Sequence, residues 1–216
     1  MAITTEAALS TPEGLFDLRA LIESVGTKWT EPRQELPADP IKIRGVPVEH
    51  RWCLRATLDD VKRYADPLAC DRAEALPELA EMVTIHGPQG GGKSTIGTWL
   101  LGRAARMMPK QLSLWTSVAD LSLAFTESPR GRTCPEVDFA RGAAVTLLDD
   151  LGQEAQNEAT RELVTDIIAR RRARHLMTIV TTGLNSAQIE ARYGGGIVRR
   201  LTEQGRSHVL GCKRRS

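Results

Sequence analysis

The chain has 216 residues, a length that allows one well-formed hydrophobic core and at most a small appendage. Its 29 lysine and arginine residues nearly balance 27 aspartate and glutamate residues, so the overall charge excludes a general polyanion binder, and any nucleic-acid surface must be local. The four cysteines are widely separated, without metal-ligand spacing, which indicates reduced thiols in a cytoplasmic protein. No stretch approaches the length needed to cross a bilayer, so we expect no membrane attachment.

The first fifty residues predict a short helical N-terminal extension. A capping box at Ser10 and Glu13 and a terminal Gly26 bound an amphipathic helix over 10–26, and a spacer punctuated by prolines follows at 29–47. We expect residues 1–50 to dock on a partner protein, with packing on the chain's own core as an equal alternative. Residues 51–216 are expected to form the main domain.

The main domain is expected to begin with a short helix through Tyr64, capped by Thr57 and Asp60, and then to alternate strands with helices. The predicted strands are 82–86, 112–116, 143–149, 176–182 and 208–210, and the predicted helices are 94–108, one opened by Ser117 and Asp120, 157–174, and further helices after residue 182. Such alternation predicts an α/β fold with a parallel sheet covered by helices on both faces, and a ligand at the carboxyl ends of the strands.

Residues 87–94 fit the phosphate-loop pattern, in which two glycines flank four residues and are followed by lysine and a hydroxyl residue. Consecutive backbone N–H groups in such a turn, with the positive end of the following helix, bind phosphate oxygens. The alternative is a glycine-rich surface turn with a solvated lysine. In that case the strand before it and the helix after it would match the phosphate-loop pattern only by chance. The residues expected to bind a nucleoside triphosphate are Gly87, Pro88, Gln89, Gly90, Gly91, Gly92, Lys93, Ser94 and Thr95.

Lys93 is expected to reach the β- and γ-phosphates as a point charge, and Ser94 to place its hydroxyl on a bound Mg²⁺. An apolar strand that ends in Asp149 and Asp150 supplies the second half of the site. Asp149 is the predicted Mg²⁺ residue, acting through water. Asp150, or Glu154 four residues later, could orient the attacking water, although paired aspartates after a strand also cap turns.

Two groups of basic residues are candidates for a local nucleic-acid surface. One is Arg170, Arg171, Arg172 and Arg174, and the other is Lys213, Arg214 and Arg215. A solvated helix face and a basic tail are the alternative interpretations, at about even odds for each group.

From about Gly45 to its end, the chain resembles the DnaC-type helicase loaders and IstB-type transposition helper ATPases of the AAA+ class. The segments that carry this resemblance are 45–47, 56–60, 115–121, 147–152 with Glu154, and 192–201. The acidic segment 147–152 is the most specific of them. The resemblance implies a P-loop NTPase fold of AAA+ type, ATP and Mg²⁺ as cofactors, and ATP hydrolysis.

The resemblance also implies that Arg200 acts as an arginine finger in trans, at the γ-phosphate of a neighbouring subunit, so that the active unit is a homo-oligomer. Arg199 is the substitute candidate. Gly183 stands where the family places a sensing asparagine, and Thr182 or Asn185 is expected to replace it.

The sequence ends at Ser216, which leaves little or no room for the C-terminal helical lid of many AAA+ proteins. Any sensor residue of that lid is then missing, or is supplied by Arg214 or Arg215.

The resemblance implies single-stranded DNA as a partner, and the loop 126–135, with Arg130 and Arg132, could line a central pore. Aromatic residues make up only 4% of the chain, so we expect electrostatic binding that falls with salt. The leading interpretation is an ATP-dependent helicase loader that docks on a replicative helicase in DNA replication. Its rival is an IstB-like helper that assembles on duplex DNA and recruits a transposase. A small-molecule kinase and an ATP-switched binding module remain open, although the two aspartates favour water as the acceptor.

Overall fold

A computed structural model describes residues 42–77, 79–128, 133–203 and 207–214. The helix predicted at 10–26, the spacer up to residue 41, and Arg130 and Arg132 of the predicted pore loop lie outside the described residues. The described ranges belong to one compact unit, Pro40–Ser216. No helix in these ranges is long and apolar enough to cross a membrane.

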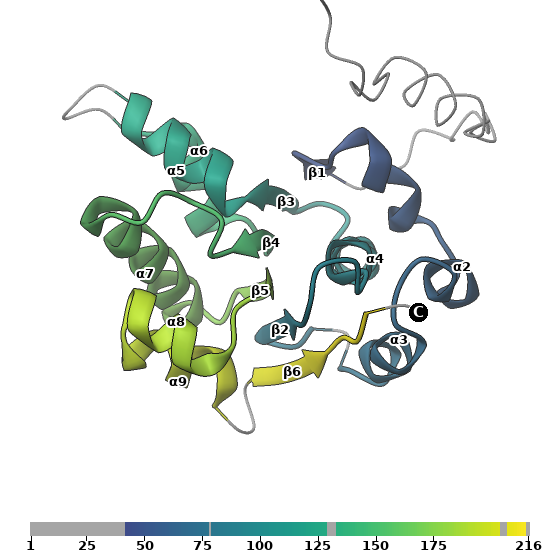
Figure 1. The fold of residues 1–216 in the computed structure, drawn as a ribbon. Helices are drawn as coiled ribbons and strands as arrows, with labels where there is room; N and C mark the ends of the chain where they lie inside the picture. The colour runs from purple at the N-terminus through teal and green to yellow at the C-terminus, as the bar shows by residue number, and fades with distance from the viewer. Residues whose placement is uncertain (1–41, 78, 129–132, 204–206, 215–216) are drawn as a thin grey trace, which may run out of the picture. The chain divides into compact units, whose positions relative to one another are not determined.

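A parallel sheet of six strands forms the centre of this unit (Figure 1). The strands are β1 (Lys42–Arg44), β2 (Met82–His86), β3 (Leu112–Ser117), β4 (Val145–Leu151), β5 (Met177–Thr182) and β6 (Ser207–Gly211). Their order across the sheet is β1-β3-β4-β5-β2-β6, and every neighbouring pair is parallel. The predicted α/β architecture is confirmed, and all five predicted strands are present.

Helices cover both faces of the sheet, as Figure 1 shows. On one side lie the 3-10 helix η1 (Val48–Leu54) and helices α2 (Leu58–Lys62), α3 (Pro67–Glu74) and α4 (Lys93–Met107). On the other side lie α5 (Val118–Glu127), α6 (Pro135–Gly142), α7 (Glu158–Ala173), α8 (Ser186–Tyr193) and α9 (Gly195–Thr202). The predicted caps are in place, because the Thr57 and Ser117 side chains both accept the backbone N–H three residues later.

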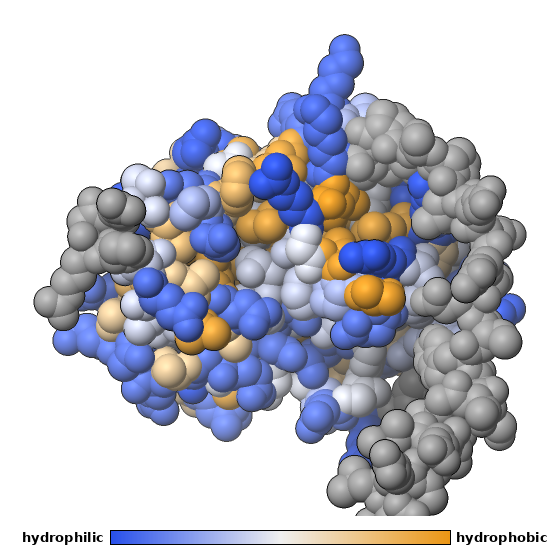
Figure 2. Space-filling view, turned by 90° about the horizontal axis from the view of Figure 1, so that it is seen from above, coloured by the Kyte–Doolittle hydropathy of each residue, from blue (hydrophilic) through white to orange (hydrophobic). Residues whose placement is uncertain are grey.

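Each face of the sheet carries its own hydrophobic core. In β4, Val145 and Leu147 pack with the α4 side, whereas Leu148 and Leu151 pack with α5 to α9. Strands buried on both faces are typical of parallel sheets, and they explain why this segment is almost continuously apolar. Figure 2 shows that the outer surface is mostly hydrophilic on the face it presents, with apolar residues gathered in part of it.

The edge strand β1 was not predicted, because its residues had been interpreted as part of the spacer. A strand of three residues is too short to show a periodic pattern. Gly45 follows it with a φ of 82°, and a Cβ at this position would lie 2.0 Å from the Trp115 carbonyl oxygen. A glycine is therefore required for the chain to leave β1 so close to β3.

The carboxyl ends of β4, β5 and β2 are adjacent, because these three strands are neighbours in the sheet. The phosphate-loop segment follows β2, the two aspartates end β4, and Gly183 follows β5. The topology therefore gathers the predicted site residues of three separate segments at one edge of the sheet.

Candidate active site

The phosphate loop connects β2 to α4, as the sequence predicted. Gly92 is the N-terminal cap of α4 with a φ of 76°, and a Cβ there would lie 2.4 Å from the Cα of Ala65. Gly90 also has a positive φ, but nothing lies within 4 Å of the position of its Cβ. The loop is thus packed against protein at Gly92 and open at Gly90, a shape that leaves room for phosphate oxygens.

Lys93 is the first residue of α4 and is buried. Its Nζ donates a hydrogen bond of 3.0 Å to the Pro88 carbonyl oxygen, so the ammonium group lies over the loop. Among the other predicted nucleotide residues, Gln89 is exposed, Ser94 is half-buried and Thr95 is buried. The ammonium group is therefore held where it can meet a phosphate at the loop.

Two segments that the sequence analysis did not include support the loop from behind. The Asp66 backbone N–H donates to the Gly91 carbonyl oxygen, and the Asp66 carboxylate accepts the backbone N–H of Lys213 at 2.6 Å. Cys212 packs against Gly87 and Gly91. Asp66 caps α3 with proline at the next position, a pattern that the sequence could have revealed.

Asp149 lies within β4, which runs two residues further than predicted. Its buried Oδ1 accepts a hydrogen bond of 2.6 Å from the Thr181 hydroxyl. Burial raises the pKa of Asp149, and the adjacent Asp150 also raises it, whereas hydrogen bonds from Thr181 and Ser94 oppose the shift. The charge of His50 also opposes the shift, but no ion pair to this carboxylate is present among the described residues, so its buried charge lacks a direct ionic partner.

Ser94 lies close enough to Asp149 to lower the pKa of its carboxyl, so a hydroxyl and a carboxylate are neighbours where the loop meets β4. These are the two residues predicted to hold Mg²⁺, and oxygen ligands of this kind suit that ion. No group of three or more His, Cys, Asp or Glu side chains in the described ranges could hold a metal. A Mg²⁺ here would therefore take its remaining ligands from water and from the nucleotide.

Asp150 is exposed and has a φ of 55°, in a region that non-glycine residues seldom adopt. Its backbone N–H donates to the Thr181 hydroxyl at 2.8 Å, and the pairing of β4 with β5 is irregular between Leu148 and Leu151. The irregularity directs Asp149 inward and Asp150 outward within the same strand end.

Glu154 lies in a different setting from Asp149, although it too is buried. Its Oε1 accepts hydrogen bonds from Arg192 Nε at 3.0 Å and from the Tyr193 hydroxyl, and its Oε2 accepts the Gly152 N–H at 2.9 Å. Both carboxylate oxygens are thus bonded to protein donors. The residue joins the loop after β4 to α8, and the sequence analysis did not assign Arg192 or Tyr193 as partners of Glu154.

Of the two predicted sensor candidates, Thr182 donates its hydroxyl to the Leu151 carbonyl oxygen at 2.7 Å and accepts the Leu184 N–H. Asn185 caps α8 in a capping box with Gln188. Neither side chain bonds to Asp149 in the described part of the chain. The residue that does is Thr181, which the sequence analysis had not singled out, because alternation along β5 does not identify the facing strand.

The predicted finger residues lie on α9. Arg199 is exposed, and Arg200 is half-buried with its Nη1 donating to the Gly196 carbonyl oxygen at 3.1 Å. Within the described ranges, no hydrogen bond or ion pair joins either guanidinium to the phosphate loop. The geometry of one chain is therefore compatible with a finger that acts on another subunit.

Together, the parallel sheet, the loop that opens α4 and the aspartate of β4 form an α/β fold of the P-loop type. A scan of protein-family models and a search of curated proteins found no match to this sequence. Solved structures, however, match with TM-scores above 0.5, and the resemblance read from the sequence is confirmed at the level of structure.

The chain is similar to the DnaC helicase loader, with 21% identity, coverage of 76% of this chain and 99% of that one, and a TM-score of 0.61. It is similar to DnaI with 22% identity, coverage of 79% and 96%, and the same TM-score. AMPPCP-bound DnaA from Aquifex aeolicus matches with 18% identity, coverage of 67% and 44%, and a TM-score of 0.53. At such identities the likeness is one of fold.

Proposed function

We propose that this chain is an ATP-dependent helicase loader of DNA replication, a cytoplasmic homo-oligomer that binds ATP, Mg²⁺ and single-stranded DNA. Residues 1–50 would dock it on a replicative helicase. The observation that carries the proposal is the contact between Ser94 and Asp149 beside a phosphate loop that is open at Gly90. The fold supports it, because the DnaC helicase loader is similar over 76% of this chain.

In the proposed reaction, the backbone N–H groups of the loop and Lys93 hold the β- and γ-phosphates. Mg²⁺, when bound, neutralises charge on the phosphate oxygens. The hydrogen bond from Thr181 holds the carboxylate of Asp149, which would serve as a ligand of the metal. Asp150 is the candidate to orient the attacking water, because it is exposed and no protein donor bonds its side chain in the described residues. Arg200 of a neighbouring subunit would meet the charge that develops on the γ-phosphate.

The first test of this proposal measures ATP hydrolysis by the full chain against protein concentration. Turnover that rises with assembly supports a finger in trans, whereas a monomeric kinase retains its turnover on dilution. Arg200→Ala should bind ATP normally and lose the stimulated turnover by roughly a thousandfold, the scale of an arginine finger. Normal stimulation in this variant, with loss in Arg199→Ala, would move the finger to Arg199.

The second test identifies the partner. The full chain and a chain without residues 1–41 are used as bait for a purified replicative helicase and, separately, for a transposase. Capture of the helicase by the full chain alone supports loading. Capture of the transposase only contradicts it and favours the IstB-like alternative.

A further inference from the structure

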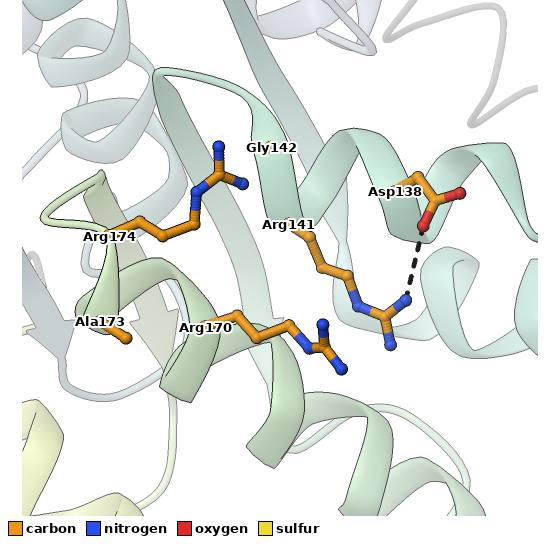
Figure 3. Close-up of a pocket in the computed structure, with 6 residues that line it drawn as sticks. All are labelled: Asp138, Arg141, Gly142, Arg170, Ala173 and Arg174. Carbon is orange, nitrogen blue, oxygen red and sulfur yellow. Dashed lines mark hydrogen bonds and ion pairs between the residues drawn. The ribbon is translucent and has the colours of Figure 1, made fainter.

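A cavity of about 360 Å³ lies between the C-terminal ends of α6 and α7 (Figure 3). Its lining residues are Asp138, Arg141, Gly142, Arg170, Ala173 and Arg174. Since α6 ends just before β4 and α7 just before β5, this arginine cavity lies at the amino edge of the sheet, opposite the phosphate loop. Two of its lining residues, Arg170 and Arg174, belong to the basic group that the sequence analysis singled out.

Two of the arginines are held in place by a shared carboxylate. Arg141 approaches Asp166 Oδ2 at 2.5 Å through Nη2, and Arg170 Nε donates to Asp166 Oδ1 at 2.5 Å. Burial alone would raise the pKa of Asp166, but hydrogen bonds from Arg170 and Arg141 hold it below its usual value. Asp166 is therefore ionised at neutral pH, and the two guanidinium groups are oriented before any ligand arrives.

Donors remain unused in the arginine cavity. Arg170 bonds to Asp166 through its Nε only. In the described ranges, no hydrogen bond or ion pair involves its Nη atoms or the guanidinium of Arg174. Both side chains are exposed, and Figure 3 shows them extending from the end of α7 toward the end of α6. Arg141 is not available in this way, because its Nη1 pairs with the lining residue Asp138 at 3.5 Å and its other nitrogens with Asp166. The cavity thus offers two guanidinium groups, those of Arg170 and Arg174, to an incoming anion.

Capping of the two helices does not account for these arginines. The carbonyl oxygens of Ala140 in α6 and of its C-cap Ala143 accept hydrogen bonds from the buried Arg171 at 2.9 and 2.8 Å. Near the end of α7, the carbonyl oxygens of residues 170–172 accept backbone N–H groups, including that of Arg174. Among the described residues, none of these helix-end hydrogen bonds is donated by the Arg170 or Arg174 side chain.

A buried positive charge lies behind the arginine cavity. Arg171 is fully buried, bonds to carbonyl and hydroxyl oxygens only, and has no carboxylate partner among the described residues. Burial, together with the nearby Arg174, lowers its pKa to about 9. An anion in the cavity would offset the repulsion between these two residues.

We infer that the arginine cavity binds backbone phosphates of nucleic acid through Arg170 and Arg174, beside Arg141, which stays paired with carboxylates. The inference rests on the proposed function, because it assigns a contact surface to its DNA partner. Guanidinium groups bind phosphate in a bidentate manner, and no aromatic side chain lines the cavity, so bases are not stacked there. The contact is therefore independent of base sequence and weakens with salt.

The test is binding of a labelled single-stranded oligonucleotide to the full chain, followed by fluorescence anisotropy at several salt concentrations. The variant Arg170→Gln with Arg174→Gln removes both charges, keeps a polar amide at each position and leaves Arg141 on Asp166. We expect about a tenfold loss of affinity at low salt. The dependence of log affinity on log salt should become shallower by about 1.4, from two phosphate contacts at about 0.7 each.

The matched control is Arg161→Gln with Lys110→Gln, which removes the same charge from exposed positions outside the arginine cavity. Two results together support the inference. The control variant should bind the oligonucleotide about as well as the wild type, and the cavity variant should bind duplex and single-stranded DNA more weakly to the same extent. Equal binding by the two double variants overturns it, as does competition by polyglutamate as strong as that by the oligonucleotide. ATP hydrolysis is measured in parallel. If the wild type does not hydrolyse ATP, the proposed function is refuted. If the cavity variant binds DNA as well as the wild type does, only this inference is refuted.

Discussion

Asp149, in β4, and Glu154, in the loop that follows, are both buried carboxylates, yet their surroundings differ. Asp149 meets hydroxyl groups, from Thr181 and Ser94, and no protein cation is paired with it in the described residues. Glu154 meets Arg192, the Tyr193 hydroxyl and a backbone N–H. The charge of Glu154 is thus compensated by protein groups, whereas the charge of Asp149 would be compensated by a bound cation.

This difference separates a ligand-binding carboxylate from a structural one without reference to any family. A buried charge without a partner lowers the stability of the folded state, and such charges occur mainly at functional sites. A buried charge bonded on all sides contributes to the fold, and its removal leaves other groups unpaired. The comparison therefore assigns opposite consequences to two similar substitutions.

The largest effect is expected from Asp149→Asn. Loss of the metal-binding carboxylate should lower ATP turnover by on the order of a thousandfold, because metal charge stabilisation is worth several kcal/mol. The melting temperature should stay the same or rise, since a costly buried charge is removed. Steady-state hydrolysis and thermal unfolding measure the two effects. A strongly destabilised variant with normal turnover would reverse the assignment.

Glu154→Gln should act in the opposite way. It leaves Arg192 without its carboxylate in a mostly buried position, and we expect the free energy of unfolding to fall by about 3 kcal/mol. Turnover of the folded fraction should stay within a few-fold of wild type. Denaturant unfolding is the measurement, with Glu158→Gln as the control, because the exposed pair with Arg161 should cost less than about 1 kcal/mol. A large loss of turnover without loss of stability would restore Glu154 as the water-orienting residue.

The smallest effect is expected from Thr181→Val, which removes a hydroxyl that bonds both aspartates of the strand end. Because one hydrogen bond to a charged group is lost, we expect turnover to fall by about tenfold. The variant Thr181→Ser, which keeps the hydroxyl, should restore it. Thr182→Val is the matched control, since it loses a buried hydrogen bond to Leu151 but none to Asp149. If Thr182→Val lowers turnover more than Thr181→Val does, Thr182 is the sensor as the sequence suggested.

The sequence predicted the parts of this molecule that local rules determine. The phosphate loop and the alternation of strands and helices depend on glycine conformation and on apolar runs, both readable within a few residues. The strand β1 was missed because three residues carry no period, and α6 was missed because its opening residue Pro135 had been assigned to the predicted loop 126–135.

The parts that were missed depend on contacts between distant residues. Thr181 bonds Asp149 across 32 positions, and Arg192 reaches Glu154 across 38. No periodic pattern encodes such a pairing, because it is set by strand order and by the packing of α8. Candidate carboxylates could therefore be named from the sequence, whereas their roles could be separated only in three dimensions.

The hydrogen bond from the Lys213 backbone to Asp66 has a consequence for biosynthesis. It joins residues 147 positions apart, and β6, just before Lys213, pairs with the strand that enters the phosphate loop. A nascent chain therefore completes the support behind this loop only after β6 and Lys213 have been made. We expect nucleotide to stabilise a chain that includes them but not one that stops before β6.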